Sequence, residues 1–390
     1  MIFKTASPIS PDVTVAIDSM PVDYLSLHRI SIEEHENQHT LMVLDFGGLP
    51  PENITDFIER PVRVTIDYPN LDGVEFVGYV VFLEPSSVTN FGLVNDSPFQ
   101  MTRVYCMGAS YLMKSKKSKS WENVTISDIA TTIADEYKFS VSVPLDTYRF
   151  PRLVQTGQSD WEFLVETIQQ LGYSMNVTGT HLHIWDPFKA LSRSVSFAVL
   201  KTINGLSGDV SPAIGQVLRF EARFGAVTTT ASRTPDTIHV LDSDGNIITV
   251  SSSLTDEVSG LGDSLESQFT NTLVKNATSF EMAKRLVSGN LRKKFSIDAT
   301  VDITGNPTIR PGGVIKLDKY DSKLDGFWYV KGTKHTVTKS ELISVLDIVT
   351  DGTTNLNPII NTTNTFKTPP ASTLLRNHWV SETHSVDIYE

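Results

Sequence analysis

Cysteine is almost absent from this chain, since Cys106 is the only one among 390 residues. A single cysteine excludes an intrachain disulfide and any metal site built from several thiolates. The sequence contains no apolar run near the length of about 20 residues that a membrane-spanning helix needs, and the N-terminus lacks the features of a secretory signal peptide. We therefore expect a soluble protein made in the cytosol, with Cys106 buried in a strand.

Positive charge is also in deficit. The chain has 33 Lys and Arg residues against 45 Asp and Glu residues, which gives a net charge of −12 at pH 7. Nucleic acids and anionic membranes require patches of Lys and Arg, so this balance argues against either as the main partner. The one basic run, Lys114 to Lys119, is expected to be a solvated loop between domains, with phosphate contact as the alternative.

Motifs of catalysis and cofactor binding are missing as well. The sequence has neither a Walker phosphate loop nor a dinucleotide-binding G-x-G-x-x-G motif. Gly157-Gln158-Ser159 begins like a nucleophile elbow, but Trp161 stands where the second glycine is required. Ser159 is therefore expected to cap a helix rather than to act as a nucleophile.

Three polar patterns could hold a metal ion, but each has a simpler interpretation. His35 and His39 lack a clear third ligand and are expected at a polar hairpin tip. His181 and His183 point to the same side of one strand, which is expected to be a solvent-facing edge. Asp242 to Asn246 begins like a calcium loop, but its glycine and its final acidic residue are misplaced, so a hairpin turn is expected. The sequence thus predicts no catalytic, cofactor-binding or metal-binding residues, no cofactor and no enzyme activity.

Strands are predicted over most of the first 112 residues and again near the C-terminal end, because apolar residues alternate in both regions. Two hairpins far apart in the sequence resemble each other: Val62 to Val80 and Ile315 to Val330 both place an alternating strand before Leu-Asp-Gly and an aromatic-rich strand after it. Asp-Gly is favoured in tight turns that need a positive φ. The similarity predicts two similar β-barrels, unless it reflects only what all hairpins share.

Helical periodicity appears between these β regions. Thr125 with Asp128, and Ser159 with Glu162, form the capping-box pattern that starts a helix. A further amphipathic helix is expected from Phe280 to Phe295. A hairpin is expected at residues 238–250, followed by a linker rich in Ser, Thr and Asn up to residue 279.

Several motifs, in this order and spacing, carry a resemblance to a known family. They are Gln158 followed by Ser-Asp-Trp-Glu-Phe-Leu at a helix start, Leu171-Gly172-Tyr173 at its end, Leu182-His183-Ile184-Trp185 in a strand, the helix from Phe280, the turn Arg310 to Gly313, Asp325 to Val330, and Thr333-Lys334-His335. Over residues 1 to 350 the chain resembles the tail-hub proteins of bacteriophages. That family includes the late-control D proteins, the hubs of large contractile-tail phages and the N-terminal part of type VI secretion spike proteins.

The resemblance implies an α+β, β-rich, multidomain fold, with two similar tube-like β-barrels and an α/β module between and beside them. The boundaries that it implies are 1–112 for the first barrel, 113–213 joined by 236–299 for the module, 214–235 with 300–352 for the second barrel, and 353–390 for an extended C-terminal arm.

The resemblance also implies a structural, non-enzymatic virion protein: the hub of a viral tail baseplate, in a tail of the contractile type. As a symmetry adaptor, a homotrimer would form a ring of six barrels between the hexameric tail tube, or a distal tube protein, and the trimeric central spike. Wedge and tape measure proteins are further implied partners. A trimer can cap a hexameric tube only if each chain offers two equivalent surfaces. Phage DNA would pass through an acidic lumen without specific binding, no membrane is involved, and synthesis takes place in the host cytoplasm.

Alternatives stay open at this level. The chain could be a tail-associated cell-wall hydrolase or carrier, or the hub of a type VI or phage-derived injection particle. Type VI spike proteins continue into a β-helical needle and some hubs carry a lysozyme or peptidase; here both are expected on separate polypeptides. The C-terminal arm, with Leu374-Leu375 and Trp379 as apolar anchors, is expected to grip the spike, although a disordered tail fits the same residues.

Overall fold

The computed structural model describes residues 12–21, 27–47, 54–68, 71–88, 99–187, 190, 198–201, 215–224, 237–241, 247–251, 297–318, 324–338, 341–350 and 386–389. The expected helix over residues 280–295, and most of the expected linker and C-terminal arm, lie outside these residues. Among the described residues, no helix is long and apolar enough to cross a membrane.

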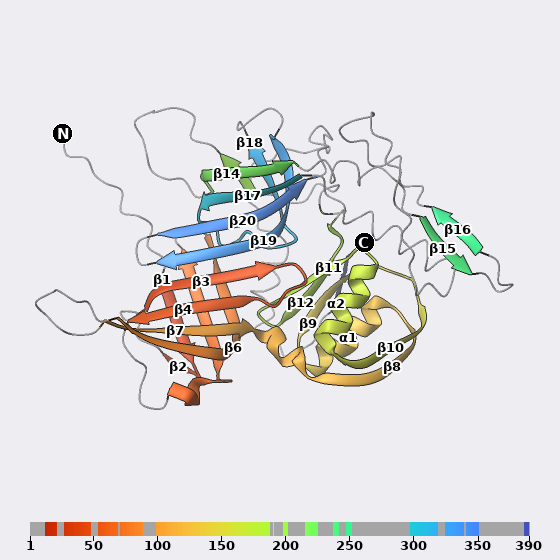
Figure 1. The fold of residues 1–390 in the computed structure, drawn as a ribbon, viewed down its shortest axis with the longest axis horizontal. Helices are drawn as coiled ribbons and strands as arrows, with labels where there is room; N and C mark the ends of the chain where they lie inside the picture. Colours follow the sequence, from red (N-terminus) through yellow and green to blue (C-terminus); the bar gives the residue numbers. More distant parts are fainter. Residues whose placement is uncertain are drawn as a thin grey trace, which may run out of the picture.

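A large curled sheet of 13 strands contains residues from both halves of the chain (Figure 1). Its strands are β1 (Asp12–Ile17), β2 (Met20–Pro21), β3 (Leu27–His35), β4 (Leu41–Gly47), β5 (Pro61–Tyr68), β6 (Leu71–Val88), β7 (Phe99–Gly108), β13 (Ala198–Lys201), β14 (Val217–Phe224), β17 (Ile297–Thr304), β18 (Val314–Asp318), β19 (Gly326–Thr338) and β20 (Leu342–Thr350). A short 3-10 helix, η2 (Ile54–Phe57), precedes β5.

The strand order of this sheet repeats. We call β3-β4-β7-β6-β5-β1 the N-terminal half-sheet and β14-β17-β20-β19-β18-β13 the C-terminal half-sheet. Position by position the strands pair in the same antiparallel manner, except that β13 joins β18 in parallel whereas β1 joins β5 antiparallel. The hairpins β5–β6 and β18–β19 occupy the same place in the two half-sheets, as their sequence similarity predicts.

The irregularities of the strands repeat as well. The β6–β7 register shifts between Val80 and Phe82, and the β19–β20 register shifts between Val330 and Gly332. Bulges of this kind bend a strand and pin its register, and they are structural features rather than defects. Their matching positions make Phe82 the structural equivalent of Gly332.

An ion pair is repeated too. The register shifts just before Arg29 in β3 and just before Arg219 in β14. Arg29 forms an ion pair of 2.6 Å with Asp45 on β4, and Arg219 forms one of 2.9 Å with Asp302 on β17. The two half-sheets are therefore equivalent at the level of single residues.

Strand pairing joins the half-sheets into one sheet, because β19 pairs with β18 along its first part and with β3 from Gly332 to Thr338. Each half-sheet has its own apolar core on its inner face. Val337 and Leu342 of the C-terminal half-sheet belong to the core of the N-terminal one, so the cores meet at this seam. Cys106 lies in the N-terminal core and is 1% exposed, as expected.

The α/β module lies beside the sheet (Figure 1) and has a third core. Its elements are η3 (Ala109–Lys114), β8 (Lys116–Val124), α1 (Ile126–Glu136), β9 (Ser140–Pro144), β10 (Phe150–Ser159), α2 (Asp160–Gln170), β11 (Ser174–Thr178), β12 (His181–Trp185) and β21 (Val386–Tyr389). Both helices begin with the capping boxes predicted from the sequence. β15 (Thr237–Leu241) and β16 (Ile247–Ser251) form the predicted hairpin, as a two-stranded sheet of their own, and its turn lies outside the described residues.

The structure differs from the sequence expectation at several strands, three of which concern the domain boundaries and the basic run. Residues 116–119 of the basic run are part of β8, paired with β10, so the expectation of a solvated loop is wrong. Lys116 and Lys119 are exposed in this strand, whereas Lys117 is partly buried. β13 pairs with β18 of the large sheet rather than with the module. β21, at the end of the expected arm, pairs in parallel with β9 of the module.

The double ion pair at Asp45 gives a test of the repeat. The side chain of Asp45 is 6% exposed and accepts from both Arg29 and Arg103, whereas the side chain of Asp302 is 21% exposed. We expect Asp45→Asn to lower stability by about 1–3 kcal/mol, because two guanidinium groups lose the buried negative charge and one of the two oxygen atoms that accept from them. Asp302→Asn, the matched control, should have a smaller effect on the melting temperature. Equal effects would contradict this ranking.

Candidate functional site: the junction at the β3–β4 tip

The turn between β3 and β4, residues Glu36 to Thr40, is the point where the three parts of the molecule meet. It extends from the N-terminal half-sheet and contacts both the α/β module and the C-terminal half-sheet. We call these contacts the junction. In a protein whose sequence lacks catalytic motifs, the contacts that fix the relative positions of its parts are the first functional candidate.

Asn37 binds the edge of the module through its backbone and its side chain. Its N–H donates to the carbonyl of Met175 at 2.7 Å, and its Oδ1 accepts from the N–H of Met175 at 3.0 Å. The residue has a φ of 62°, in the left-handed region that asparagine tolerates better than most residues. Asn37 thus makes with Met175 of β11 the two hydrogen bonds that a residue of a neighbouring strand would make.

His39 fills the space between the tip and helix α2. Its ring stacks on Trp161 at 4.2 Å between centroids, and Nδ1 lies 2.8 Å from Oγ of Ser110. Burial, with a smaller effect from Lys114, lowers the pKa of His39 to about 4. His39 is therefore a neutral aromatic contact at neutral pH. It lies at a hairpin tip, as the sequence predicts, but packed against the module.

A buried hydrogen-bond chain connects the tip with the C-terminal half-sheet. The hydroxyl of Tyr329 on β19 donates to Oε2 of Glu36 at 2.7 Å and accepts from Nε1 of Trp185 at 2.7 Å. Burial, and then the charge of Glu36, raise the pKa of Tyr329 well above its usual value. The phenol stays protonated and links a residue from each of the three parts.

The two histidines of β12 lie inside the module sheet rather than at its edge. β12 pairs with β11 on one side and with β9 on the other, so the expectation of a solvent-facing edge is wrong. Ser142 lies 2.8 Å from Nε2 of His181 and 2.6 Å from Nδ1 of His183. Burial, and then the neighbouring His181, lower the pKa of His183 to about 3. The rings of His181, His183 and Trp185 stack in succession and lead towards Tyr329.

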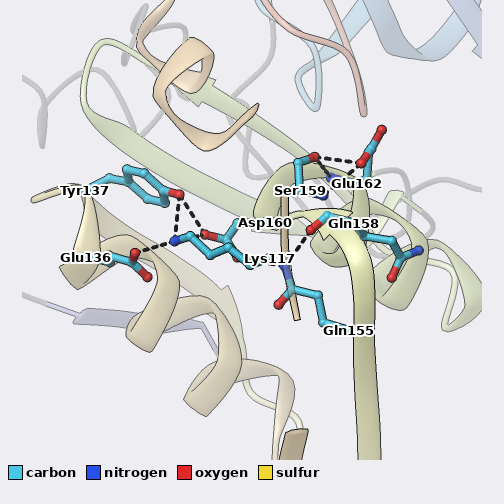
Figure 2. A network of polar contacts seen from close by, with 8 residues as sticks. All are labelled: Lys117, Glu136, Tyr137, Gln155, Gln158, Ser159, Asp160 and Glu162. Carbon is cyan, nitrogen blue, oxygen red and sulfur yellow. Dashed lines mark hydrogen bonds and ion pairs between the residues drawn. The ribbon is translucent and has the colours of Figure 1, made fainter. Parts of the chain in front are cut away.

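A second polar network holds the helices of the module together (Figure 2). Asp160, at the start of α2, accepts from Lys117 at 2.7 Å, from Tyr137 at 2.6 Å and from Gln155 at 2.9 Å. Lys117 also forms an ion pair with Glu136 at the end of α1. One carboxylate and one ammonium thus connect β8, β10 and both helices.

The electrostatics of this network favour structure over catalysis. Burial alone would raise the pKa of Asp160, but the hydrogen bonds from Lys117, Tyr137 and Gln155 outweigh it and leave the pKa below its usual value. Burial and the bond to Asp160 raise the pKa of Tyr137 to about 12. Asp160 therefore stays charged and Tyr137 stays neutral at neutral pH, so neither is prepared as a general acid or base.

Ser159 is engaged as the sequence predicts. Its Oγ accepts from the N–H of Glu162 at 3.1 Å and donates to Oε2 of the same residue at 3.0 Å (Figure 2). The first of these bonds forms the capping box of α2, together with the N–H of Ser159, which donates to Oε2 of Glu162 at 2.8 Å. The hydroxyl is therefore occupied in helix capping, and no histidine contacts it among the described hydrogen bonds.

The cavity at the junction is too small for a substrate. It offers about 10 Å³, on a scale where one water needs about 10–15 Å³. Glu34 and Arg310 line it and form an ion pair of 3.3 Å. Within the part of the chain that the structure describes, no three His, Cys, Asp or Glu side chains gather as a metal site would require. The described contacts of the junction therefore serve to hold the parts of the molecule together.

The central role of Tyr329 can be tested by removing one oxygen atom. We expect Tyr329→Phe to lower stability by about 1–3 kcal/mol, because it leaves the indole N–H of Trp185 and the carboxylate of Glu36 without their buried partner. Hydrogen exchange should also rise at β11 and β12. Tyr105→Phe removes an exposed hydroxyl that donates to Glu84 and serves as the control. Unchanged melting and exchange in Tyr329→Phe would contradict this role.

The buried histidines predict a pH dependence. His39 and His335 have pKa values lowered to about 4 and His183 to about 3, with burial the main cause in each. Unfolded histidine titrates near 6.5, so between about pH 6.5 and 4 the unfolded chain binds protons that the folded chain does not. Stability should fall as the pH is lowered through this window, by up to about tenfold in the unfolding constant per pH unit for each histidine.

Melting temperatures measured from pH 7 to 4.5 check this expectation. His39→Gln removes one of the three titrating groups and should make the dependence shallower. A melting temperature that stays constant across the window would show that the histidines are accessible to protons in the folded state.

Comparison with known proteins places this architecture among tail proteins. The 43 kDa tail protein of prophage MuSo2 from Shewanella oneidensis is similar with a TM-score of 0.62 and 15% identity, over 88% of this chain and 99% of that one. A tail protein from Neisseria meningitidis MC58 has a TM-score of 0.64 and 11% identity, over 90% and 99%.

A third similar structure comes from a secretion system. The E. coli c3393 protein, described as a type VI secretion component with structural similarity to the T4 tail proteins gp27 and gp5, has a TM-score of 0.53 and 11% identity, over 86% of this chain and 76% of that one. At such identities the likeness establishes the tail-protein type of fold.

Sequence comparison adds the family. No curated protein matches the chain. The model of the family described as "Alg8 N-terminal domain" matches residues 94–339, from just before β7 to just beyond the end of β19. That match includes the whole α/β module except β21, and covers well over half of the chain. The chain therefore belongs to the Alg8 N-terminal domain family.

Proposed function

We propose that this chain is the structural hub of a tail baseplate, a trimer that connects a hexameric tail tube to a trimeric central spike. The observation that carries the proposal is the repeated strand order of the two half-sheets. A chain that contains two equivalent units presents six such units in a trimer, which is what a junction between sixfold and threefold symmetry needs.

The equivalence of the half-sheets supports the proposal in detail. Strand order, bulges and the Arg–Asp ion pair all recur, so one tube subunit could contact either half in a similar way. In the proposed ring each half-sheet forms one tube-like barrel, and the α/β module projects from it. The junction at the β3–β4 tip then keeps the module in a fixed orientation relative to both barrels.

The similar structures support the same setting, since two are tail proteins and one is a type VI component similar to tail proteins. We therefore place the chain in the virion, with tube and spike proteins as neighbours and DNA passing through the ring. The net charge of −12 suits a lumen along which a duplex slides without binding. A hub in a type VI or phage-derived injection particle is the second candidate, favoured by the similarity to the E. coli protein.

The decisive measurement is the solution mass by light scattering, with negative-stain microscopy of the same peak. We expect a mass of three times 43.2 kDa and rings with six lobes around a central hole. The same measurement is repeated after addition of the spike protein, because the spike can nucleate the ring. A chain that stays monomeric with its spike present would contradict the proposal.

A cell-wall assay on the same sample tests the enzymatic alternative. Peptidoglycan cleavage in a zymogram would favour a hydrolase or carrier, whereas rings without cleavage support a structural role.

A further inference from the structure

We infer that neighbouring copies of this chain join by antiparallel strand pairing, between the outer part of β6 in one copy and β14 in the next. The inference uses the seam between β19 and β3, which joins the half-sheets within one chain, as the template for the contact between chains. The number of copies in the ring rests on the proposed function, whereas the pairing itself rests on the internal repeat.

Two open strand edges are the first observation. β19 pairs with β18 up to Tyr329 and then with β3. Its equivalent, β6, pairs with β5 up to Tyr79, and beyond that residue no described strand pairs with the same edge. β3 lies between β4 and β19, whereas its equivalent, β14, pairs only with β17 among the described strands. Strand edges that no described strand covers are ones that readily accept another strand.

The repeated bulges define the register of the proposed pairing. At the seam, Lys334 of β19 lies opposite Glu33 of β3. Counting from the equivalent bulges, Lys334 corresponds to Glu84 in β6, and Glu33 corresponds to Arg223 in β14. The template therefore places Glu84 of one copy opposite Arg223 of the next.

The charges at this position are complementary in both cases, with their signs exchanged. Within the chain, Nζ of Lys334 lies 3.5 Å from Oε2 of Glu33. Between chains, the acidic residue would be Glu84 on β6 and the basic residue Arg223 on β14, both exposed. Directly opposed unlike charges stabilise strand pairs, and like charges destabilise them. The exchange preserves attraction at both seams.

The apolar residues of the open edge are incompletely covered. Ile30 and Ile32 of β3 are 1% and 3% exposed, because β19 covers their edge. Their equivalents on β14, Phe220 and Ala222, are only partly buried against the C-terminal core. A neighbouring β6 would complete their burial, which the hydrophobic effect favours.

Pro85 sets a limit on the strength of this contact. It lies in the exposed part of β6 and has no N–H to donate to a neighbouring strand. Proline is found at the edges of sheets for this reason. The interchain ladder would accordingly be weaker than the β19–β3 ladder, and the edge is protected against indiscriminate pairing.

The proposed contact is heterologous, since β6 of one copy meets β14 of the next. Such contacts form closed rings when the rotation between units closes on itself, and filaments when it does not. Because every seam in the assembly would follow the same template, half-sheets would alternate around the ring with similar spacing. A closed trimer then contains three seams within chains and three between them.

Charge reversal tests the register. We expect Glu84→Arg and Arg223→Glu each to weaken association by about tenfold, because like charges would face each other. The double variant E84R/R223E should restore association, which is measured by light scattering over a concentration series with spike protein present. The in-chain double reversal E33K/K334E is the matched control and should leave association unchanged. Single variants that associate normally, or a double variant that is not rescued, would overturn the register.

Disulfide capture separates this inference from the proposed function. Chains that carry Glu84→Cys are mixed with chains that carry Arg223→Cys and then oxidised, with Glu84→Cys plus Ala222→Cys as the control, since a slip of one residue points the side chain to the opposite face. A covalent dimer in the first mixture alone supports the pairing, whatever the final ring size. Trimers without this cross-link would leave the hub proposal standing and overturn the strand pairing. Absence of both overturns both.

Discussion

The pairing of β19 with β3 is the interaction on which the rest of the structure depends. It makes one sheet from two half-sheets, and it brings Tyr329 to the β3–β4 tip, where the tip meets the module. Backbone hydrogen bonds in a ladder allow little rotation, so the two half-sheets are held at a fixed angle. The proposed hub, which would match the symmetry of two neighbours, requires such rigidity.

The junction combines contacts of different kinds at a small site. Asn37 pairs as a strand residue would, His39 stacks as an aromatic residue, and Tyr329 donates to a carboxylate. Each of these contacts is directional, so together they favour one orientation of the module. Apolar contacts alone would allow a range of orientations. Buried polar networks of this kind specify a unique arrangement when every member is satisfied.

The sequence predicted best what depends on nearby residues. The capping box of Ser159 and Glu162 uses positions three apart, and the two hairpins depend on their turns, so both could be recognised from local patterns. Tyr329 and Glu36 are in contact although most of the sequence separates them, and no local pattern marks such a pair. The basic run was misread because charge suggests a solvated loop, whereas Lys117 is held by Asp160 from another element.

The single thiol has a consequence for where the protein can work. Cys106 is 1% exposed, and burial raises its pKa far above the usual range, so almost no thiolate forms. With no second cysteine in the sequence, no intrachain disulfide has to form before the chain is complete. The described fold therefore keeps its one thiol in an unreactive state, and no disulfide within this sequence depends on an oxidising compartment.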